Sequence, residues 1–149
     1  MASHAATAFL LAFCVAVGAF AAEKLVFSTQ THPSCPVLVS SAKASRAYAF
    51  QSAEFRNESR SAVESVRVVV TLSGAGDKEQ VESVSLAAKL ARSESRRVEL
   101  GLGNLRELYR KAKGIDQEFA VVVLSIESVQ FADGAEWRAG EPLIYDPAR

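Results

Sequence analysis

The sequence predicts a mainly β protein, folded as an antiparallel β-sandwich with one short crossover helix. Three observations support this prediction. Apolar residues alternate with polar ones along most of the chain, clusters of turn-forming residues separate these runs, and a single segment has helical spacing. Alternation with a period of two indicates strands that bury one face. Many short strands with one helix are typical of two antiparallel sheets packed face to face.

Three runs show the alternation most clearly. Their apolar faces are formed by Val66, Val68, Val70 and Leu72, then by Val84, Leu86, Ala88 and Leu90, and then by Val98, Leu100 and Leu102. Turn-forming residues separate the strands at 57–59, 73–77 and 93–95. We expect a further strand at 48–55, where the alternation shifts phase. Two edge strands are expected at 25–31 and 37–43, separated by Pro33 and Pro36.

A central strand is expected at 119–126, because this run is apolar on both faces. Up to Ile126 the buried positions are even, whereas the next apolar residues, Val129 and Phe131, are odd. One extra residue near Glu127-Ser128 would restore a single buried face. The sequence therefore predicts a β-bulge at this point.

The pair Asp133-Gly134 is typical of a tight hairpin turn, here leading into a last strand near Trp137. We expect the ring of Trp137 to pack on the core beside this turn. The core itself is expected to contain Val68, Val70, Val122, Leu124 and Ile126.

One helix is expected at about 105–113. The apolar residues that share one face of it are Leu105, Leu108, Tyr109 and Ala112. Asn104 can cap its amino end, with Glu107 at the capping-box position, and Gly114 can end it. The helix therefore has both a buried face and signals for its two ends.

The first residues are typical of a cleavable secretory signal. Residues 6–22 carry no charge, and the apolar core at 9–20 is shorter than the roughly 20 residues that span a membrane. Small residues at Ala19 and Ala21 fit a signal-peptidase site, so we expect cleavage after Ala21, with Ala22 as the alternative. The protein is therefore expected to be secreted or periplasmic.

Cleavage would leave a mature chain of residues 22–149. We expect an N-terminal segment with an edge strand at 22–35, followed by the sandwich domain at 36–149. Cys14 does not fit a lipidation site, because Phe13 precedes it where a small residue is required. After the signal, no stretch of the sequence is long and apolar enough to span a membrane.

Charge and cysteine content limit the partners. The chain has 17 Lys and Arg against 17 Asp and Glu, for a net charge of +0. A neutral chain has no overall attraction for nucleic acid, so we expect a protein or another envelope component as partner. Only Cys35 remains after cleavage, so the mature chain is expected to have no intrachain disulfide.

Patterns for common enzyme chemistries are missing from the sequence. His32 and Cys35 are the histidine and the cysteine left after cleavage, whereas a zinc site needs three or four ligands and a Cys–His nucleophile needs an orienting group. The sequence has no phosphate-binding glycine loop and no Gly-x-Ser-x-Gly elbow. We expect no catalytic residues, no cofactor and no metal. The alternative is a small hydrolase or metal-dependent enzyme that uses acidic residues with His32.

Two motifs resemble those of small exported bacterial immunoglobulin-like domains. They are Phe-Arg-Asn-Glu-Ser at 55–59 and Val-Gln-Phe-Ala-Asp-Gly-Ala-Glu-Trp at 129–137, and the likeness covers about residues 36–138. The resemblance implies an immunoglobulin-like sandwich. It implies no activity, because such families share a fold and not a function. The Asn57-Glu58-Ser59 segment is also a glycosylation sequon, which is relevant in a eukaryotic host.

Two groups of residues are candidates for a binding surface. The first is the predicted hairpin with Phe131, Asp133, Glu136 and Trp137, and the second is the basic stretch whose helix carries Arg106 and Arg110. Aromatic and arginine side chains are favoured at interfaces. We therefore expect an exported, non-catalytic domain that binds a partner. A further alternative is a structural domain that pairs with a partner through an exposed strand edge.

The export prediction is tested by the mass of the protein recovered outside the cytoplasm. Its first residue should be Ala22, because the small residues Ala19 and Ala21 direct the signal peptidase to the bond after Ala21. Cytoplasmic material that still begins with Met1 would contradict the prediction.

Overall fold

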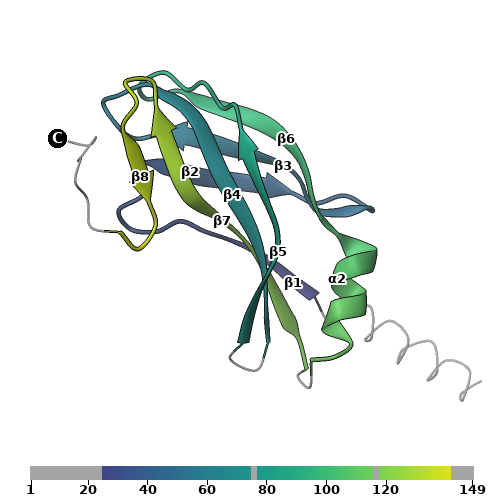
Figure 1. The fold of residues 1–149 in the computed structure, drawn as a ribbon. Coiled ribbons are helices and arrows are strands. Elements are labelled where there is room, and N and C mark those ends of the chain that lie inside the picture. Colours follow the sequence, from purple (N-terminus) through teal and green to yellow (C-terminus); the bar gives the residue numbers. More distant parts are fainter. Residues whose placement is uncertain (1–24, 75–76, 116–117, 142–149) are drawn as a thin grey trace, which may run out of the picture.

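The computed structural model describes residues 25–74, 77–115 and 118–141. These residues form eight strands and one helix (Figure 1). In chain order the elements are β1 (Leu25–Gln30), β2 (Val37–Lys43), β3 (Tyr48–Asn57), β4 (Val63–Gly74), β5 (Asp77–Leu86), β6 (Ser95–Asn104), α2 (Leu105–Ala112), β7 (Ala120–Phe131) and β8 (Glu136–Arg138).

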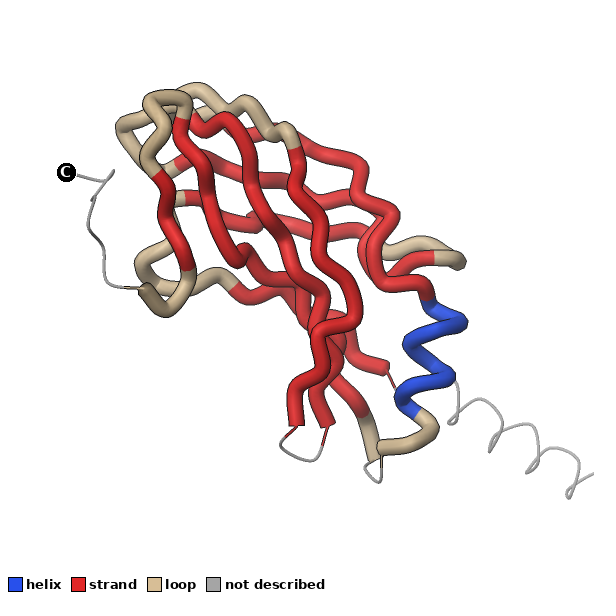
Figure 2. Tube along the Cα trace, in the orientation of Figure 1, coloured by secondary structure: helices blue, strands red, loops and turns tan. Residues whose placement is uncertain are grey.

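The strands form two sheets, which lie one behind the other in Figure 2. Sheet A has the order β1–β7–β4–β5, with β8 also paired to β7, and sheet B has the order β2–β3–β6. All pairs are antiparallel except β1 with β7. β1 and β8 follow one another along the same edge of β7, opposite residues 120–125 and 128–130. The predicted mainly β fold with largely antiparallel sheets is confirmed.

The core lies between the two sheets and uses the predicted alternating faces. All the side chains expected in it are buried: Val68, Val70, Val122, Leu124, Ile126 and Trp137. Phe50 and Phe55 of β3 are also buried in this core, on the side of sheet B. The core assignment from the sequence is therefore confirmed.

The predicted bulge in β7 is confirmed as well. The register between β4 and β7 shifts between Arg67 and Val68, which leaves Glu127 as the extra residue. Before the bulge the buried face includes Ile126, and after it the buried face continues at Val129. One residue thus restores a single core face along the whole strand.

Helix α2 links β6 of sheet B to β7 of sheet A, as expected of a crossover helix. It covers nearly the predicted range of 105–113. The Asn104 side chain caps it by accepting a hydrogen bond of 3.2 Å from the backbone N–H of Glu107. Leu108 and Ala112 are its buried residues, and both join the core.

One strand is shorter than the sequence predicts. The alternation continues to Leu90, but β5 ends at Leu86. Ala88 and Leu90 are buried residues outside that strand, and between them Lys89 has a φ of 45°, which a strand cannot contain. Leu90 makes only an isolated bridge with Val63. The alternation correctly indicated burial here, but not the backbone conformation.

The side chain of Asn57 joins two connections between strands. Its Nδ2 donates hydrogen bonds to the carbonyl oxygens of Ser61 at 2.8 Å and of Leu90 and Ala91 at 3.2 Å each. Its Oδ1 accepts from Ser59, from the backbone N–H at 2.9 Å and from the hydroxyl at 2.7 Å. Asn57 is fully buried. The Asn-Glu-Ser segment therefore has a structural role, and its amide nitrogen is not accessible for glycosylation in the folded protein.

The core assignment leads to a stability prediction. Leu124→Ala should lower the free energy of unfolding by about 2–5 kcal/mol, because it leaves a cavity at a fully buried site. Trp137→Ala should cost about 3–5 kcal/mol for the same reason.

The matched control is Leu38→Ala, which makes the same truncation at a leucine that is 39% exposed. Its expected cost is less than about 1 kcal/mol, as for most surface changes. Chemical denaturation followed by circular dichroism measures all three variants. Equal losses at Leu124 and Leu38 would contradict the core assignment.

Candidate functional site

A polar hollow lies on the outer face of sheet A, beside the bulge in β7. Its volume is about 370 Å³, within the range of small-molecule binding sites. Its charged and amide side chains include Arg67 from β4, Glu127 and Gln130 from β7, and Glu136 and Arg138 from β8. Ser85 of β5 also lines it, so the hollow gathers side chains from four neighbouring strands.

The bulge determines which side chains enter this hollow. In a regular strand only every second residue faces outward. At the bulge, Glu127 and Ser128 are consecutive residues, and both line the hollow. The carbonyl oxygen of Glu127 also accepts a hydrogen bond of 2.9 Å from the N–H of Ala139, which ties the segment after β8 to the bulge.

Two ion pairs lie in the hollow. The Nε of Arg67 is 2.7 Å from Oε2 of Glu127, and Nη2 of Arg138 is 3.2 Å from Oε2 of Glu136. The hydrogen bond that Arg138 donates to the carboxylate of Glu136 raises the pKa of Arg138 above its usual value. All four side chains are about half exposed, so the pairs add little to stability. Their main effect is to place opposite charges side by side at the hollow.

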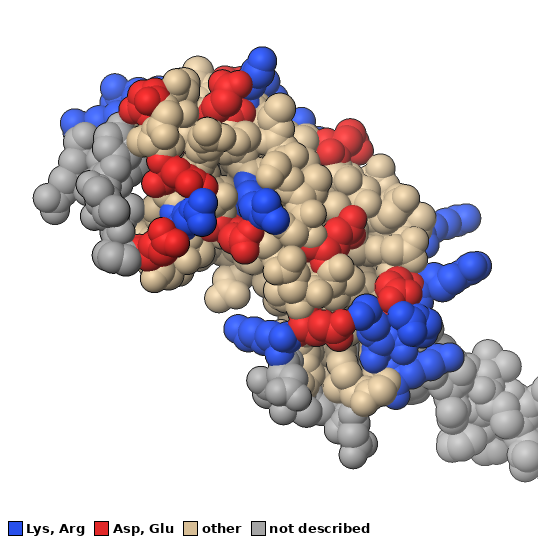
Figure 3. Space-filling view, in the orientation of Figure 1, with Lys and Arg blue, Asp and Glu red and all other residues tan. Residues whose placement is uncertain are grey.

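The hollow can bind a ligand through hydrogen bonds. Each guanidinium has N–H groups, and each carboxylate has lone pairs, beyond those used within its ion pair. The Ser128 hydroxyl and the Gln130 amide add further donors and acceptors. In Figure 3, positive and negative side chains lie side by side over this part of sheet A. The site therefore suits a polar ligand that has both donors and acceptors.

The structure separates the four hairpin residues that the sequence singled out. Glu136 lines the hollow, whereas Phe131 and Trp137 are both 1% exposed and belong to the core. Asp133 lies at the turn, where its carboxylate accepts a hydrogen bond of 3.0 Å from the N–H of Ala135. Only Glu136 therefore contributes to the candidate site.

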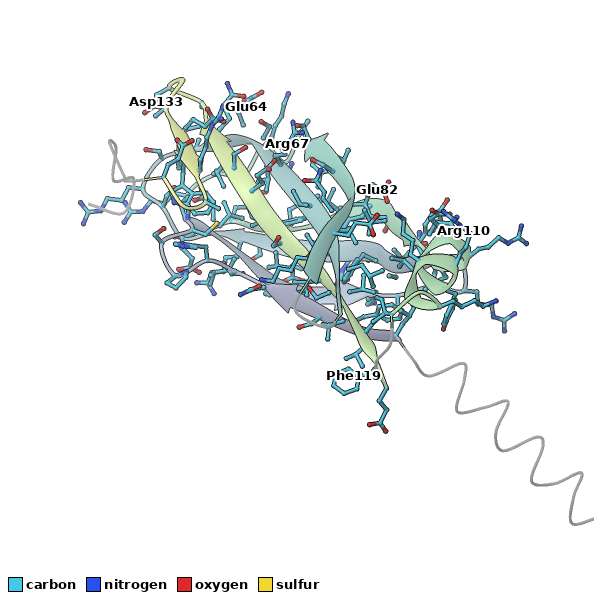
Figure 4. The ribbon with its side chains drawn as sticks, turned by 60° about the horizontal axis from the view of Figure 1, so that its bottom comes forward. Glu64, Arg67, Glu82, Arg110, Phe119 and Asp133 are labelled. Atoms are coloured by element: carbon cyan, nitrogen blue, oxygen red, sulfur yellow. The ribbon has the colours of Figure 1, made fainter. Side chains whose placement is uncertain are left out.

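Arg106 and Arg110 lie on α2, far from the hairpin. Figure 4 shows Arg110 and Asp133 at opposite ends of the molecule. Arg110 forms an ion pair with Glu107, whose pKa is lowered mainly by that hydrogen bond. Lys111 on the same helix is paired with Glu79 of β5. The structure therefore does not join the basic helix and the hairpin into one surface.

His32 and Cys35 face different groups. The Nδ1 of His32 is 2.9 Å from the hydroxyl of Ser34, which also accepts a hydrogen bond of 3.2 Å from the indole N–H of Trp137. The rings of His32 and Trp137 are 5.9 Å apart. Cys35 is buried, and its thiol donates to the carbonyl of Val37 at 3.1 Å. Neither residue lines the polar hollow.

Within the described ranges, no three His, Cys, Asp or Glu residues are grouped so that they could hold a metal ion. The hydrolase alternative requires acidic residues beside His32. The polar contacts of that ring are instead with Ser34.

Sequence reasoning missed most of the hollow, namely Arg67, Glu127, Ser128, Gln130 and Arg138. One signal was present, because the change of phase at Glu127-Ser128 indicated a bulge. Bulges often redirect side chains at functional sites.

Comparison of the chain with protein-family models, with curated proteins and with solved structures finds no match. Within the described residues, no helix combines the length and the apolar character that crossing a membrane requires.

Cys35 provides a test of the view that its thiol is structural. Burial raises the pKa of the Cys35 thiol to about 12. The folded protein should therefore react very slowly with a thiol reagent at pH 8 and rapidly once denatured. Cys35→Ser should leave the fold and any binding activity intact. Rapid labelling of the folded protein at pH 8 would contradict this assignment.

The raised pKa of the Cys35 thiol also makes the stability of the protein depend on pH. The thiol of the unfolded chain ionises near pH 8.5, whereas the folded thiol stays protonated to about pH 12. Its contribution to stability is present below about pH 8.5 and is lost as the pH rises toward 12. Cys35→Ser lacks this contribution. The free energy of unfolding of both proteins is measured as a function of pH, and the difference between the two curves isolates the contribution of the thiol.

Proposed function

We propose that this protein is an exported, non-catalytic immunoglobulin-like domain that binds a polar ligand of the cell envelope. The observation that supports this proposal is the polar hollow beside Glu127, where side chains from four strands of sheet A converge. Sheets commonly expose a plain polar face to water. This face differs from a plain one because it has a hollow of about 370 Å³ that contains two ion pairs.

The lining indicates the chemistry of the ligand. The hollow has three carboxylates, from Glu127, Glu136 and Glu141, against the guanidinium groups of Arg67 and Arg138. Among the described residues that line it there is no aromatic ring, so these residues recognise a ligand by hydrogen bonds and charge and not by stacking. We infer that the ligand is neutral or weakly cationic and rich in hydroxyl and amide groups, as envelope glycans are.

The immunoglobulin-like assignment and the export assignment belong to the same proposal. The first is supported by eight strands in two largely antiparallel sheets and by the structural use of Asn57 in the Phe-Arg-Asn-Glu-Ser motif. The second is supported by the apolar run at 9–20 and the small residues Ala19 and Ala21. A binding role needs no histidine in the hollow, which agrees with the position of His32 beside Trp137.

The proposal is tested by titrating the exported protein with soluble glycan fragments released from the envelope of its host. Backbone amide NMR signals should shift around Ser128, Gln130 and Glu136. Glu127→Gln keeps the shape of the side chain but removes the charge. It should weaken binding by roughly 10–100-fold, the value of one hydrogen bond to a charged group.

The matched control is Glu64→Gln, because Glu64 is an exposed residue of β4 that does not line the hollow (Figure 4). It should bind like the unmodified protein. Shifts confined to another surface, or equal affinity of the Glu127 and Glu64 variants, would refute the assignment of the site.

A further inference from the structure

The free strand edges of the two sheets differ in how they are protected. Charged residues protect two of them, with Lys78, Glu79 and Glu82 on β5 and Arg96, Arg97 and Glu99 on β6. β2 has a bulge between Val39 and Ser41 and ends in Lys43. Charges and bulges of this kind keep edges from pairing with other chains.

Strand β1 has neither form of protection. Its six residues, Leu-Val-Phe-Ser-Thr-Gln, carry no charge. They pair with residues 120–125 of β7 without a register shift, so the strand is regular along its whole length. Within the described part of the chain, no strand pairs with its other side. β1 therefore presents an open, uncharged edge.

Apolar surface is concentrated at the same edge. Of the four large hydrophobic side chains exposed in the described residues, three lie here: Val26 at 46%, Phe27 at 37% and Phe119 at 52%. Phe119 precedes Ala120, the partner of Leu25 in the register with β7. Figure 4 shows the Phe119 ring standing clear of the ribbon at the start of β7.

A second hollow opens beside this edge, between β1 and sheet B. It has a volume of about 220 Å³ and is lined by Phe27 and Thr29 of β1 together with Ala42, Ala49 and Phe50 of sheet B. The rings of Phe27 and Phe50 meet edge to face, with centroids 6.3 Å apart. Small apolar side chains on the sheet B side leave room for the side chain of an added strand.

We propose that this edge binds a second copy of the chain. The two β1 strands pair antiparallel about a two-fold axis and join the two A sheets into one. A two-fold interface must be complementary to itself. β1 meets this requirement because an uncharged edge does not repel its own copy, whereas the two arginines of β6 would. The same strand also supplies both the apolar side chains and one wall of the hollow that receives them.

Symmetry limits the register of this pairing. The two-fold axis stands perpendicular to the joined sheet, so the inner faces of both copies lie on the same side. Residues directly opposite each other share a face, so their numbers must have the same parity. Phe27 opposite Phe27 of the second copy places the two rings together over both hollows, with Val26 opposite Ser28. A register centred on Ser28 would instead place Phe27 opposite Thr29 and separate the two rings.

The oligomeric state of the exported protein is the first test. Its N-terminus is checked by mass, and sedimentation is measured over a range of concentrations. A dimer is expected, and Phe27→Lys should raise its dissociation constant roughly tenfold or more, because it places two like charges on the axis. Circular dichroism verifies that the variant is folded.

The matched control is Leu38→Lys, which places a lysine at an equally exposed hydrophobic residue of β2. It should dimerise like the unmodified protein. A protein that remains monomeric at all concentrations would overturn the proposal. A dimer that Phe27→Lys does not weaken would overturn it as well.

Disulfide trapping tests the register. In a Cys35→Ser background, Phe27→Cys should form a covalent dimer under mild oxidation, because opposed residues lie about 4.5–5.5 Å apart, within the reach of a disulfide. Val26→Cys is the control, since each Val26 is displaced by two residues from its copy, a distance of about 8 Å. Equal cross-linking of both variants, or none with Phe27→Cys, would refute this pairing.

Discussion

The extra residue in β7, Glu127, is the constraint on which both the core and the polar hollow depend. Side chains alternate between the faces of a strand, so without it the apolar residues after Ile126 would point to the outer face. The bulge lets Val129 face inward opposite Trp137 of β8, and both are buried. At the same point the carboxylate of Glu127 meets Arg67 on the outer face, at 2.7 Å. Core packing and the candidate binding surface therefore have a common cause.

Much of the fold can be predicted because burial on one face leaves a periodic pattern in the sequence. The change of phase after Ile126 located the bulge, and the capping pattern at Asn104 located the helix to within a residue of its end. The same reasoning was wrong at Ala88 and Leu90, where the pattern continues but the strand does not. Alternation reports which side chains are buried, whereas the positive φ of Lys89 is a property of the backbone.

The candidate site was much less predictable than the fold, for a physical reason. A charged residue on the outer face of a strand has the same local pattern whether it lines a hollow or faces open water. Arg67 and Glu127 come together only through the register of β4 and β7, which short-range patterns do not specify. Phe131 and Trp137 were candidates because aromatic residues are frequent both in cores and at interfaces, and here they serve the core.

The two surfaces proposed here have complementary consequences. The described lining of the polar hollow includes no aromatic ring, and its ion pairs are about half exposed, so we expect a single site to bind weakly. In a dimer joined through β1, the perpendicular two-fold axis keeps both outer faces of sheet A on the same side of the joined sheet. Both hollows would then face one direction. On a polymer with repeated units, engagement of the first hollow raises the effective concentration at the second, so avidity can exceed single-site affinity by about 10²–10⁴. Under the proposed dimer, the apolar edge of β1 would therefore set the number and direction of the hollows, and the hollows would set which ligand is held.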